Sequence, residues 1–345
     1  MRAAIYRDKG QASDVLKIET LARAEPELGE VRVKLEYSGV NPSDVKSRAG
    51  TTNPLMDHPL VVPHSDGSGI IDALGPLVIS RRIGQRVWLY NAQWGRAMGT
   101  AAEFVTLPVQ QAVALPDHVP FEVGASIGIP LMTAYHAVQA CGPLLGRNVV
   151  VFGAAGNVGL YATQLANMSG ARVIAVVSSD SKGQDARAAG AEEVIDYRRE
   201  DVAARVRLLT GGNGADFAIE VDAAANVRHW GEMLGFGAKV VVYGSGQAQI
   251  AVPFRPMIMG FATLYFFIVY KLPPEILRQT LDGITNADEI AATFGIDLRR
   301  ATELAHHDDQ SFIQQTTLMH VLNQSCKRAI KDRAENIAHA LGVLG

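Results

Sequence analysis

The chain has 345 residues, 48% hydrophobic and 19% charged, which fits a folded protein with a sizeable core and two domains, or three. Its 32 lysine and arginine residues stand against 35 aspartate and glutamate residues, giving a net charge of -3. A general basic field is missing, so we expect neither nucleic acid nor a membrane surface as a partner. The two cysteines, Cys141 and Cys326, suit a reducing compartment, and the N-terminus carries no apolar secretion signal, so we expect a cytoplasmic protein.

Short strands separated by turn residues dominate the first third of the chain. Residues 31–37 alternate apolar and polar side chains, the period of a half-buried strand. Three more short strands are predicted at residues 67–75, 86–90 and 102–107, between Gly, Pro and Asn turn residues. The pattern indicates a compact, barrel-like domain that ends near Asp117.

The pattern changes near Pro120. A helix is predicted over residues 121–140, with stop signals at Gly142 and Pro143. Apolar strands then alternate with amphipathic helices, and the predicted strands are residues 148–152, 172–177, 192–197, 215–221 and 238–244. Strands of nearly continuous Val and Ile, spaced by helices, predict a parallel, doubly wound sheet covered on both faces.

The most apolar segment covers residues 257–270. It is well short of the ~20 residues that a membrane-spanning helix needs, so a buried strand or a subunit interface is predicted instead. From Pro273 onward the apolar residues recur at helical spacing to the end of the chain.

The sharpest local pattern follows the first of the buried strands. Residues 153–159, GAAGNVG, join that strand to an amphipathic helix. Small residues let the backbone approach a pyrophosphate, while the start of the helix offers N–H groups and the positive end of its dipole. The pattern is AxGxxG, with Ala154 in the first position, and a glycine-rich turn without a ligand is the alternative. Because the turn lies within a series of strand–helix units, it predicts dinucleotide binding.

The residues after the second strand of this series bear on which dinucleotide is bound. Sites that prefer NAD usually place an acidic residue here to hold the ribose 2′-hydroxyl. In this chain Ser178 and Ser179 come first and Lys182 follows, a set suited to a 2′-phosphate. Asp180 lies between them and could itself take the hydroxyl. The pattern favours NADPH over NADH.

A zinc site of thiolates and imidazoles is not expected in the first domain. Tetrahedral zinc in dehydrogenases uses such ligands, yet no cysteine precedes Cys141. His58, His64 and His118 are scattered rather than set at ligand spacing, and a solvated helix end suits the residues 306–309 better than a metal does. We therefore predict no metal.

Without a metal, hydrogen-bond donors must polarise a substrate carbonyl. The candidates are Asn41, Asp44 and Lys46, which follow the strand at 31–37. Asn41 precedes Pro42, which biases it away from helix and fixes a turn. A polar turn closed by Asn and Asp side chains is the alternative.

Several motifs together resemble the zinc-free quinone oxidoreductase branch of the medium-chain dehydrogenase/reductase superfamily, the zeta-crystallin-like enzymes. The similar segments, in chain order, are SGVNPSD at 38–44, VVPHSDGSG at 61–69, GIPLMTAYHA at 128–137, GAAGNVG at 153–159 and ARAAGAEEVIDY at 186–197. The resemblance covers about residues 1–272.

The resemblance implies an α/β fold with a GroES-like β-barrel domain at residues 1–120 and a Rossmann domain at 121–272, followed by an atypical helical segment at 273–345. It implies NADPH as the cofactor and a homodimer joined edge to edge through residues 257–270. The cofactor-binding residues that it implies are Asn41, Thr133, Ala155, Gly156, Asn157, Val158, Ser178, Ser179, Lys182, Tyr197, Ser245 and Phe267.

The implied reaction is hydride transfer from NADPH to a quinone or to the β-carbon of an activated alkene, both small-molecule substrates. Asn41, Asp44 and Lys46 are the candidate catalytic residues, and solvent is the alternative proton donor. The family finishes with a strand that residues 282–345 do not show. Two alternatives therefore stay open: an NADPH-binding sensor or structural protein with little turnover, and an NADPH-dependent alcohol or aldehyde oxidoreductase.

Overall fold

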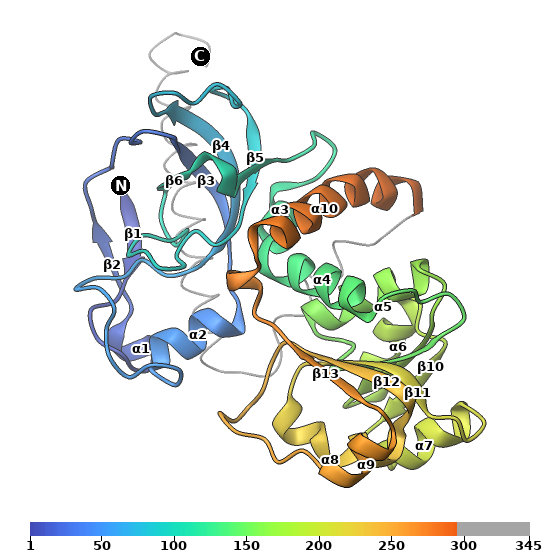
Figure 1. Cartoon of the computed structure of the whole chain (residues 1–345). Helices are drawn as coiled ribbons and strands as arrows, with labels where there is room; N and C mark the ends of the chain where they lie inside the picture. The colour runs from blue at the N-terminus through green and yellow to red at the C-terminus, as the bar shows by residue number, and fades with distance from the viewer. Residues whose placement is uncertain (295–345) are drawn as a thin grey trace, which may run out of the picture. The chain divides into compact units, whose positions relative to one another are not determined.

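The computed structural model describes residues 1–294 (Figure 1). These residues form two compact units, Met1–Gly128 and a second that begins at Ile129. The first unit therefore extends a little beyond the predicted boundary at residue 120. Most of the predicted helical segment 273–345, with Cys326 and residues 306–309, lies outside the described residues.

The first unit is built on antiparallel strands. Its main sheet has the order β6-β3-β4-β5-β7, and β1 (Arg2–Ile5) pairs with β2 (Lys17–Thr20) in a second, smaller sheet. The main strands are β3 (Glu30–Gly39), β4 (Asp66–Leu74), β5 (Arg86–Leu89), β6 (Phe104–Pro108) and β7 (Ala112–Ala114). Alternate residues such as Val31, Val33 and Ile71 are fully buried in one core, as the period of two predicts. The four predicted strands are confirmed.

Short helices complete this unit: α1 (Ala12–Val15), α2 (Pro42–Ala49), the 3₁₀ turn η1 (Val109–Gln111) and α3 (Phe121–Ser126). The alternative of a plain polar turn after Asn41 does not hold, because a helix begins there. Asn41 itself is extended, with φ -118° and ψ 156°, as a residue before proline should be. Pro42, however, occupies the first helical position, where its missing N–H and fixed φ favour a helix.

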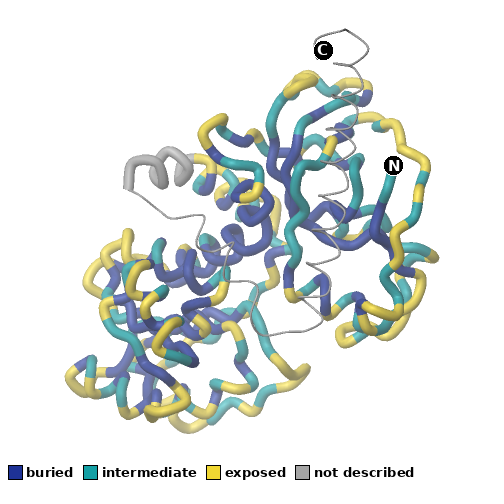
Figure 2. Tube along the Cα trace, turned by 180° about the vertical axis from the view of Figure 1, so that it is seen from behind, coloured by how far each residue is buried: buried dark blue, intermediate teal, exposed yellow. Residues whose placement is uncertain are grey.

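The second unit is a parallel, doubly wound sheet with the strand order β10-β9-β8-β11-β12-β13. Its strands are β8 (Asn148–Phe152), β9 (Arg172–Val177), β10 (Glu193–Asp196), β11 (Ala215–Glu220), β12 (Leu234–Val242) and β13 (Thr263–Phe266). Val149, Val150 and Val151 are all fully buried, because helices cover both faces of the sheet (Figure 2). The five predicted strands and the parallel sheet are confirmed.

The helices of this unit are α4 (Met132–Cys141), α5 (Asn157–Met168), α6 (Asp180–Ala188), α7 (Val202–Leu209), α8 (Ala223–Met233), α9 (Phe254–Met259) and α10 (Pro274–Phe294), with a 3₁₀ turn η3 (Val269–Lys271). The single helix predicted over 121–140 is interrupted by a π-helical segment, η2 (Ile127–Leu131). Pro130 lies within η2, and a proline there removes one backbone hydrogen bond and crowds the preceding turn.

A buried strand or a subunit interface was predicted for the apolar segment 257–270, and it is not a single buried strand. Its first residues end α9, Phe261 turns the chain with φ +52°, and only Thr263–Phe266 forms a strand. This strand, β13, lies at the edge of the sheet, and Phe266 is 56% exposed. A continuous apolar run fixes hydrophobicity but not where a helix ends and a strand begins.

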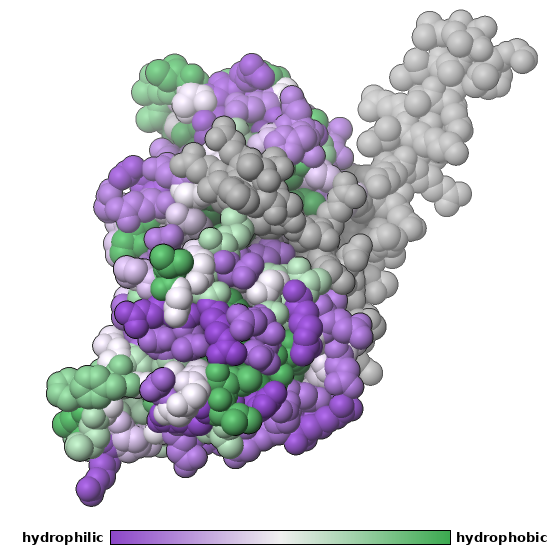
Figure 3. Space-filling view, turned by 90° about the vertical axis from the view of Figure 1, so that its right-hand side faces the viewer, coloured by the Kyte–Doolittle hydropathy of each residue, from purple (hydrophilic) through white to green (hydrophobic). Residues whose placement is uncertain are grey.

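Apolar residues on the surface are dispersed on the face drawn in Figure 3, where hydrophilic residues form a broad band between separate hydrophobic patches. Within residues 1–294, no helix has the length and apolar character to cross a bilayer.

Candidate active site

The predicted phosphate-binding turn has the strand–turn–helix geometry that its sequence indicates. β8 ends at Phe152, and α5 begins at Asn157. Gly153 has φ +64°, a left-handed conformation that glycine adopts at little cost. A Cβ on Gly159 would lie 2.2 Å from the carbonyl oxygen of Gly153, so the helix can start this close to the strand only with glycine there.

The same turn has backbone N–H donors for a pyrophosphate and lies at the position in the sheet where such ligands usually bind. Gly156 is the N-cap of α5 and has no side chain to occupy the N–H groups of the first turn. The buried Oδ1 of Asn157, at the start of α5, has no hydrogen-bond partner among the described residues. β8 lies between β9 and β11, where the strand order reverses, the usual place for a ligand in such sheets. The predicted residues 155–158 therefore fit a dinucleotide.

A second group of predicted residues lies beyond the carboxyl end of β9. Ser178 is buried, and the Ser179 hydroxyl caps α6 by accepting from the backbone N–H of Lys182 at 3.3 Å. The Tyr197 N–H donates to the Val177 carbonyl at 3.1 Å, which brings the half-exposed Tyr197 beside this strand end. The structure thus gathers four predicted residues at the ends of two adjacent strands.

Asp180, the residue that left the choice of dinucleotide open, is engaged in an ion pair. Its two carboxylate oxygens lie 2.9 and 3.2 Å from the same guanidinium nitrogen of Arg199. Arg199 follows β10, the neighbour of β9, and its Nε also lies 3.5 Å from Asp196. Sequence inspection missed Arg199, because the contact joins residues that are far apart along the chain.

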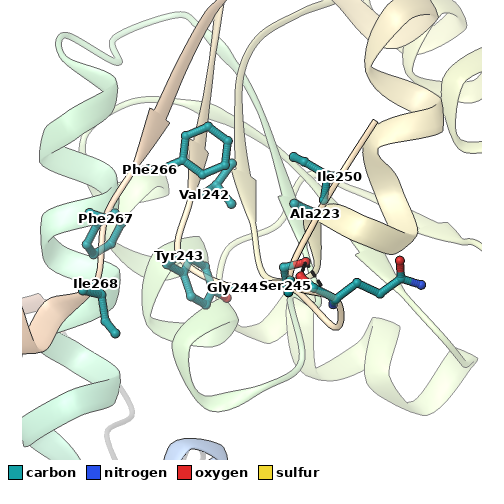
Figure 4. A pocket seen from close by; sticks show the side chains of 11 residues that line it. Ala223, Val242, Tyr243, Gly244, Ser245, Ile250, Phe266, Phe267 and Ile268 are labelled. Atoms are coloured by element: carbon teal, nitrogen blue, oxygen red, sulfur yellow. Dashed lines mark hydrogen bonds between the residues drawn. The ribbon is translucent and has the colours of Figure 1, made fainter. Parts of the chain in front are cut away.

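Ser245 and Phe267, predicted on the nicotinamide side, line one pocket of about 300 Å³. The pocket lies beyond the carboxyl ends of β12 and β13. Figure 4 shows Val242 and Phe266 on one side and Ala223 and Ile250 on the other, with Ser245 below Ala223 and beside Gly244. The Ser245 hydroxyl donates to the Gln247 carbonyl at 2.7 Å, which folds this loop back on itself. The pocket is mainly apolar with a few backbone and hydroxyl groups, as ligand pockets usually are.

A buried carboxylate supports the loop that carries Ser245. Glu220, fully buried at the end of β11, accepts from the Asp222 N–H and from the Asn226 amide, both at 2.8 Å. Asp222 in turn accepts from the Gly246 N–H at 2.7 Å. Burial raises the pKa of Glu220 to about 7. The chain Glu220–Asp222–Gly246 was not foreseen, since an acidic residue at the end of an apolar strand gives no signal of its partners.

Thr133 lies in the first turn of α4 and is buried, with its hydroxyl donating to the Ile129 carbonyl at 2.6 Å. One turn further along, His136 contacts two aromatic residues. Its ring lies edge-on to Phe267 with centroids 4.6 Å apart, and its Nε2 is 3.0 Å from the Tyr265 hydroxyl. α4 therefore packs beside the strand that carries Phe267.

In the first unit, Asn41 is held in a buried polar cluster. Its backbone N–H donates to Asp44 Oδ2 at 2.7 Å, a contact of the kind that caps a helix start. Its side-chain Nδ2 donates to Asp66 Oδ2, also at 2.7 Å. Asn41, Asp44 and Asp66 are all at most 5% exposed, whereas Lys46 is on the exposed face of α2. Asp44 therefore stabilises the start of α2, and burial raises its pKa to about 7.

Asp66 and His64 are residues of this cluster that sequence inspection did not assign. His64 has φ +78° and is 1% exposed, and its Nδ1 lies 2.9 Å from the Ser38 hydroxyl. Burial lowers the pKa of His64 to about 3, so its ring is neutral at pH 7. A Cβ on Gly128 would lie 2.3 Å from Asp66 Oδ1, so that glycine makes room for the carboxylate. Nothing in the segment HSDGSG indicates these partners, because Ser38 and Asn41 are more than twenty residues away from it in the chain.

Among residues 1–285, whose side chains the structure describes, no three His, Cys, Asp or Glu side chains gather in a way that could hold a metal ion. Cys141, the cysteine within this range, is buried in α4, and burial raises the pKa of its thiol to about 12.

Comparison with known proteins agrees with this arrangement. Residues 27–117 match the family model described as alcohol dehydrogenase GroES-like domain, and residues 157–286 match that described as zinc-binding dehydrogenase. Human quinone oxidoreductase is 32% identical over 237 residues, which cover 67% of this chain and 70% of the human protein. The chain belongs to the medium-chain dehydrogenase/reductase superfamily and has quinone oxidoreductases among its relatives.

Two solved structures share the fold closely. A mycobacterial protein solved as a complex with NADPH superimposes with a TM-score of 0.76 at 27% identity, covering 88% of this chain and 96% of that one. An NAD-dependent alcohol dehydrogenase gives a TM-score of 0.73 at 30% identity, covering 82% and 90%. The antiparallel unit is thus a GroES-like domain and the parallel unit a Rossmann domain, and the chain is an oxidoreductase of this superfamily.

Proposed function

We propose that this protein is an NADPH-dependent, metal-free oxidoreductase that transfers hydride to a quinone or to an activated alkene. The observation that carries the proposal is the turn between β8 and α5, where Gly159 leaves no room for a side chain and Gly156 leaves the helix start uncapped. The quinone oxidoreductases among the relatives and the NADPH complex among the similar structures support the choice of cofactor and acceptor.

The Rossmann domain would hold the cofactor along the carboxyl ends of its strands. The N–H groups at residues 155–158 suit the pyrophosphate, and Ser178, Ser179, Lys182 and Tyr197 suit the 2′-phosphate side. The pocket at Ser245 and Phe267 suits the nicotinamide side, with Thr133 on the neighbouring helix. Bound NADPH supplies the hydride, and the protein orients the reactants and excludes water.

Asn41 would act on the substrate through its amide. The Nδ2 of that amide donates to Asp66 Oδ2 at 2.7 Å, and the backbone N–H of Asn41 donates to Asp44 Oδ2. A donor fixed in this way in a buried cluster can stabilise negative charge that develops on a substrate oxygen. Asp44, with its pKa raised to about 7, and Lys46, on the exposed face of α2, are the candidates for supplying the proton, and solvent is the alternative.

The proposal of a metal-free reaction rests on the residues of the GroES-like domain. No cysteine occurs before Cys141, and His64 is committed to Ser38 with its ring buried and neutral. Hydrogen-bond donors such as Asn41 would therefore do what a Lewis acid does in zinc-dependent relatives.

We also propose that the protein is a cytoplasmic homodimer that pairs through the edge of its parallel sheet. β13 is one of the two edge strands of this sheet; Phe266, its last residue, is 56% exposed, and Ile268, two residues further on, is 47% exposed. Exposed apolar residues next to an unpaired strand edge are a usual place for strand addition by a second copy.

The reaction is tested by following NADPH absorbance with 1,4-benzoquinone, a simple enone, and a panel of alcohols and aldehydes. We expect saturable NADPH oxidation with the quinone or the enone, unchanged after treatment with a chelator and in protein free of zinc by elemental analysis. Turnover that is restricted to alcohols and aldehydes, or that is lost with zinc, would contradict the proposal. NADPH binding without turnover on the whole panel would favour a sensor.

A further inference from the structure

The ion pair between Asp180 and Arg199 lies where a dinucleotide-binding site distinguishes its two cofactors. Asp180 comes three residues after the end of β9, and Arg199 comes three residues after the end of β10. The two strands are parallel neighbours, with Asp196 paired to Val177. Asp180 and Arg199 therefore both follow the carboxyl ends of their strands, on the same side of the sheet. Ser178, Ser179 and Lys182 also follow the carboxyl end of β9.

An acidic side chain at this place normally accepts hydrogen bonds from the ribose hydroxyls of NAD and repels the 2′-phosphate of NADPH. Both oxygens of Asp180 instead face the guanidinium of Arg199, at 2.9 and 3.2 Å. The carboxylate is therefore turned toward the loop after β10, and its charge is balanced. The same guanidinium also lies 3.5 Å from Asp196, whose side chain is only 10% exposed, which fixes the direction from which Arg199 reaches Asp180.

The ion pair between Asp180 and Arg199 does little to stabilise the fold. A role in recognising the dinucleotide therefore explains its presence better than a role in folding. The side chains of Arg199 and Asp180 are 67% and 76% exposed. Ion pairs at such exposure contribute almost nothing measurable to stability, because water and salt screen them. Their charges nevertheless act on a ligand that binds beside them, since a bound phosphate excludes part of that water.

We propose that Arg199 is a specificity-determining residue, which neutralises Asp180 and thereby makes the site prefer a dinucleotide with a 2′-phosphate. This inference rests on the proposed function, because it assumes that a dinucleotide binds at the β8–α5 turn. It explains how a chain with an acidic residue at the NAD-typical position selects NADPH.

The test measures dissociation constants for NADPH and NADH by calorimetry, without turnover, in the full-length protein and in the variants Arg199→Gln, Asp180→Asn and the double variant. Arg199→Gln leaves Asp180 charged and unpaired, so we expect NADPH to bind about tenfold more weakly and NADH to change by less than about twofold. In the double variant the repelling carboxylate is absent too, and NADPH affinity is expected to return to within about threefold of the wild type.

Arg278→Gln is the matched control, since Arg278 is 60% exposed and also pairs with carboxylates, but does so on α10. It should leave both dissociation constants unchanged. Equal weakening of NADPH and NADH by Arg199→Gln would overturn the inference, as would a double variant that binds NADPH as weakly as Arg199→Gln alone. Failure of the wild type to bind either nucleotide would instead overturn the proposed function, and this inference with it.

Discussion

At the scale of single residues, Asn41 is the group on which the proposed chemistry depends most. Its Nδ2 is held by Asp66 and its backbone by Asp44, so the amide is positioned before any substrate arrives. Asn41→Ala should lower kcat for quinone reduction by about a hundredfold, the usual effect of removing one fixed donor to a developing oxyanion. The NADPH dissociation constant should change by less than about threefold, since the pyrophosphate contacts would remain.

Steady-state kinetics measures kcat of Asn41→Ala, and a parallel titration measures its NADPH dissociation constant. Asn53→Ala, at an exposed asparagine in a nearby loop, is the control that should leave kcat unchanged. A wild-type rate in Asn41→Ala would remove Asn41 from the active site.

Leu77 gives a residue-scale prediction about stability. It is the third residue of a turn closed by the Val78 N–H and the Gly75 carbonyl, has φ +64°, and is 82% exposed. Proline at the second position and a left-handed third residue are typical of a type II turn, in which glycine is preferred third. Leu77→Gly should therefore raise the free energy of unfolding, by about 1 kcal/mol, because a Cβ in the left-handed region is unfavourable and no packing is lost.

Urea denaturation measures the change. Ile79→Gly is the matched control, since Ile79 is 96% exposed but lies outside the left-handed region, and it should destabilise the protein. A loss of stability in both variants would show that the turn does not favour glycine.

At the scale of elements, the sequence predicted which segments are strands or helices better than it predicted the residues at which they begin and end. The Val-rich strands β8 and β9 were correctly predicted because burial on both faces selects continuous apolar runs. β1 and β2 were missed because neither has the burial pattern of a half-buried strand: three successive residues of β1 are buried, and three of the four residues of β2 are exposed. The segment 257–270 was misjudged because the turn at Phe261 comes from a φ of +52°, which nothing in its apolar sequence indicates.

The candidate site divides in the same way. The turn after β8 could be predicted, because its small residues follow one another in the sequence. The partners Asp66 of Asn41 and Arg199 of Asp180 could not, because each contact joins residues far apart in the chain. Side-chain pairing of this kind is set by the fold rather than by local pattern.

The junction between β8 and α5 yields an element-scale prediction. In Gly159→Ala the new Cβ would lie 2.2 Å from the Gly153 carbonyl oxygen, a backbone atom that can move only if the helix moves. We expect weaker binding of both NADPH and NADH, by about tenfold or more, together with lower stability.

Gly156→Ala separates stability from binding. Its Cβ would lie 3.3 Å from the same oxygen, so it should reduce stability less than Gly159→Ala does, while a methyl group at the start of the helix should still weaken binding of both nucleotides. Calorimetric titration and thermal unfolding of both variants test the difference. Wild-type affinity in Gly159→Ala would mean that the dinucleotide does not depend on this close approach.

At the scale of the whole molecule, the buried carboxyl of Glu220 links folding to pH. Burial raises its pKa from the ordinary 4.5 to about 7 in the folded state. Between these values the folded protein keeps a proton that the unfolded chain releases, so this contribution to stability is full below pH 4.5 and is lost as the pH rises to about 7. In Glu220→Gln the contribution is absent.

The free energy of unfolding of the wild type, minus that of Glu220→Gln, should therefore fall as the pH rises from 4.5 to 7 and stay constant above pH 7. Urea denaturation at a series of pH values measures it. Glu275→Gln is the comparison, since the Arg278 hydrogen bond lowers the pKa of that exposed carboxyl and predicts a slope of opposite sign. A difference independent of pH would show that folding does not raise the pKa of Glu220.

The central claim, that a GroES-like domain and a Rossmann domain here form an NADPH-dependent reductase, is tested most directly by titrating the purified protein with NADPH and with NADH. We predict saturable binding of both, with NADPH the tighter by about tenfold or more because a 2′-phosphate adds charged contacts. Tighter binding of NADH would contradict the assignment of the residues after β9. No binding of either nucleotide would contradict the account of the β8–α5 turn itself.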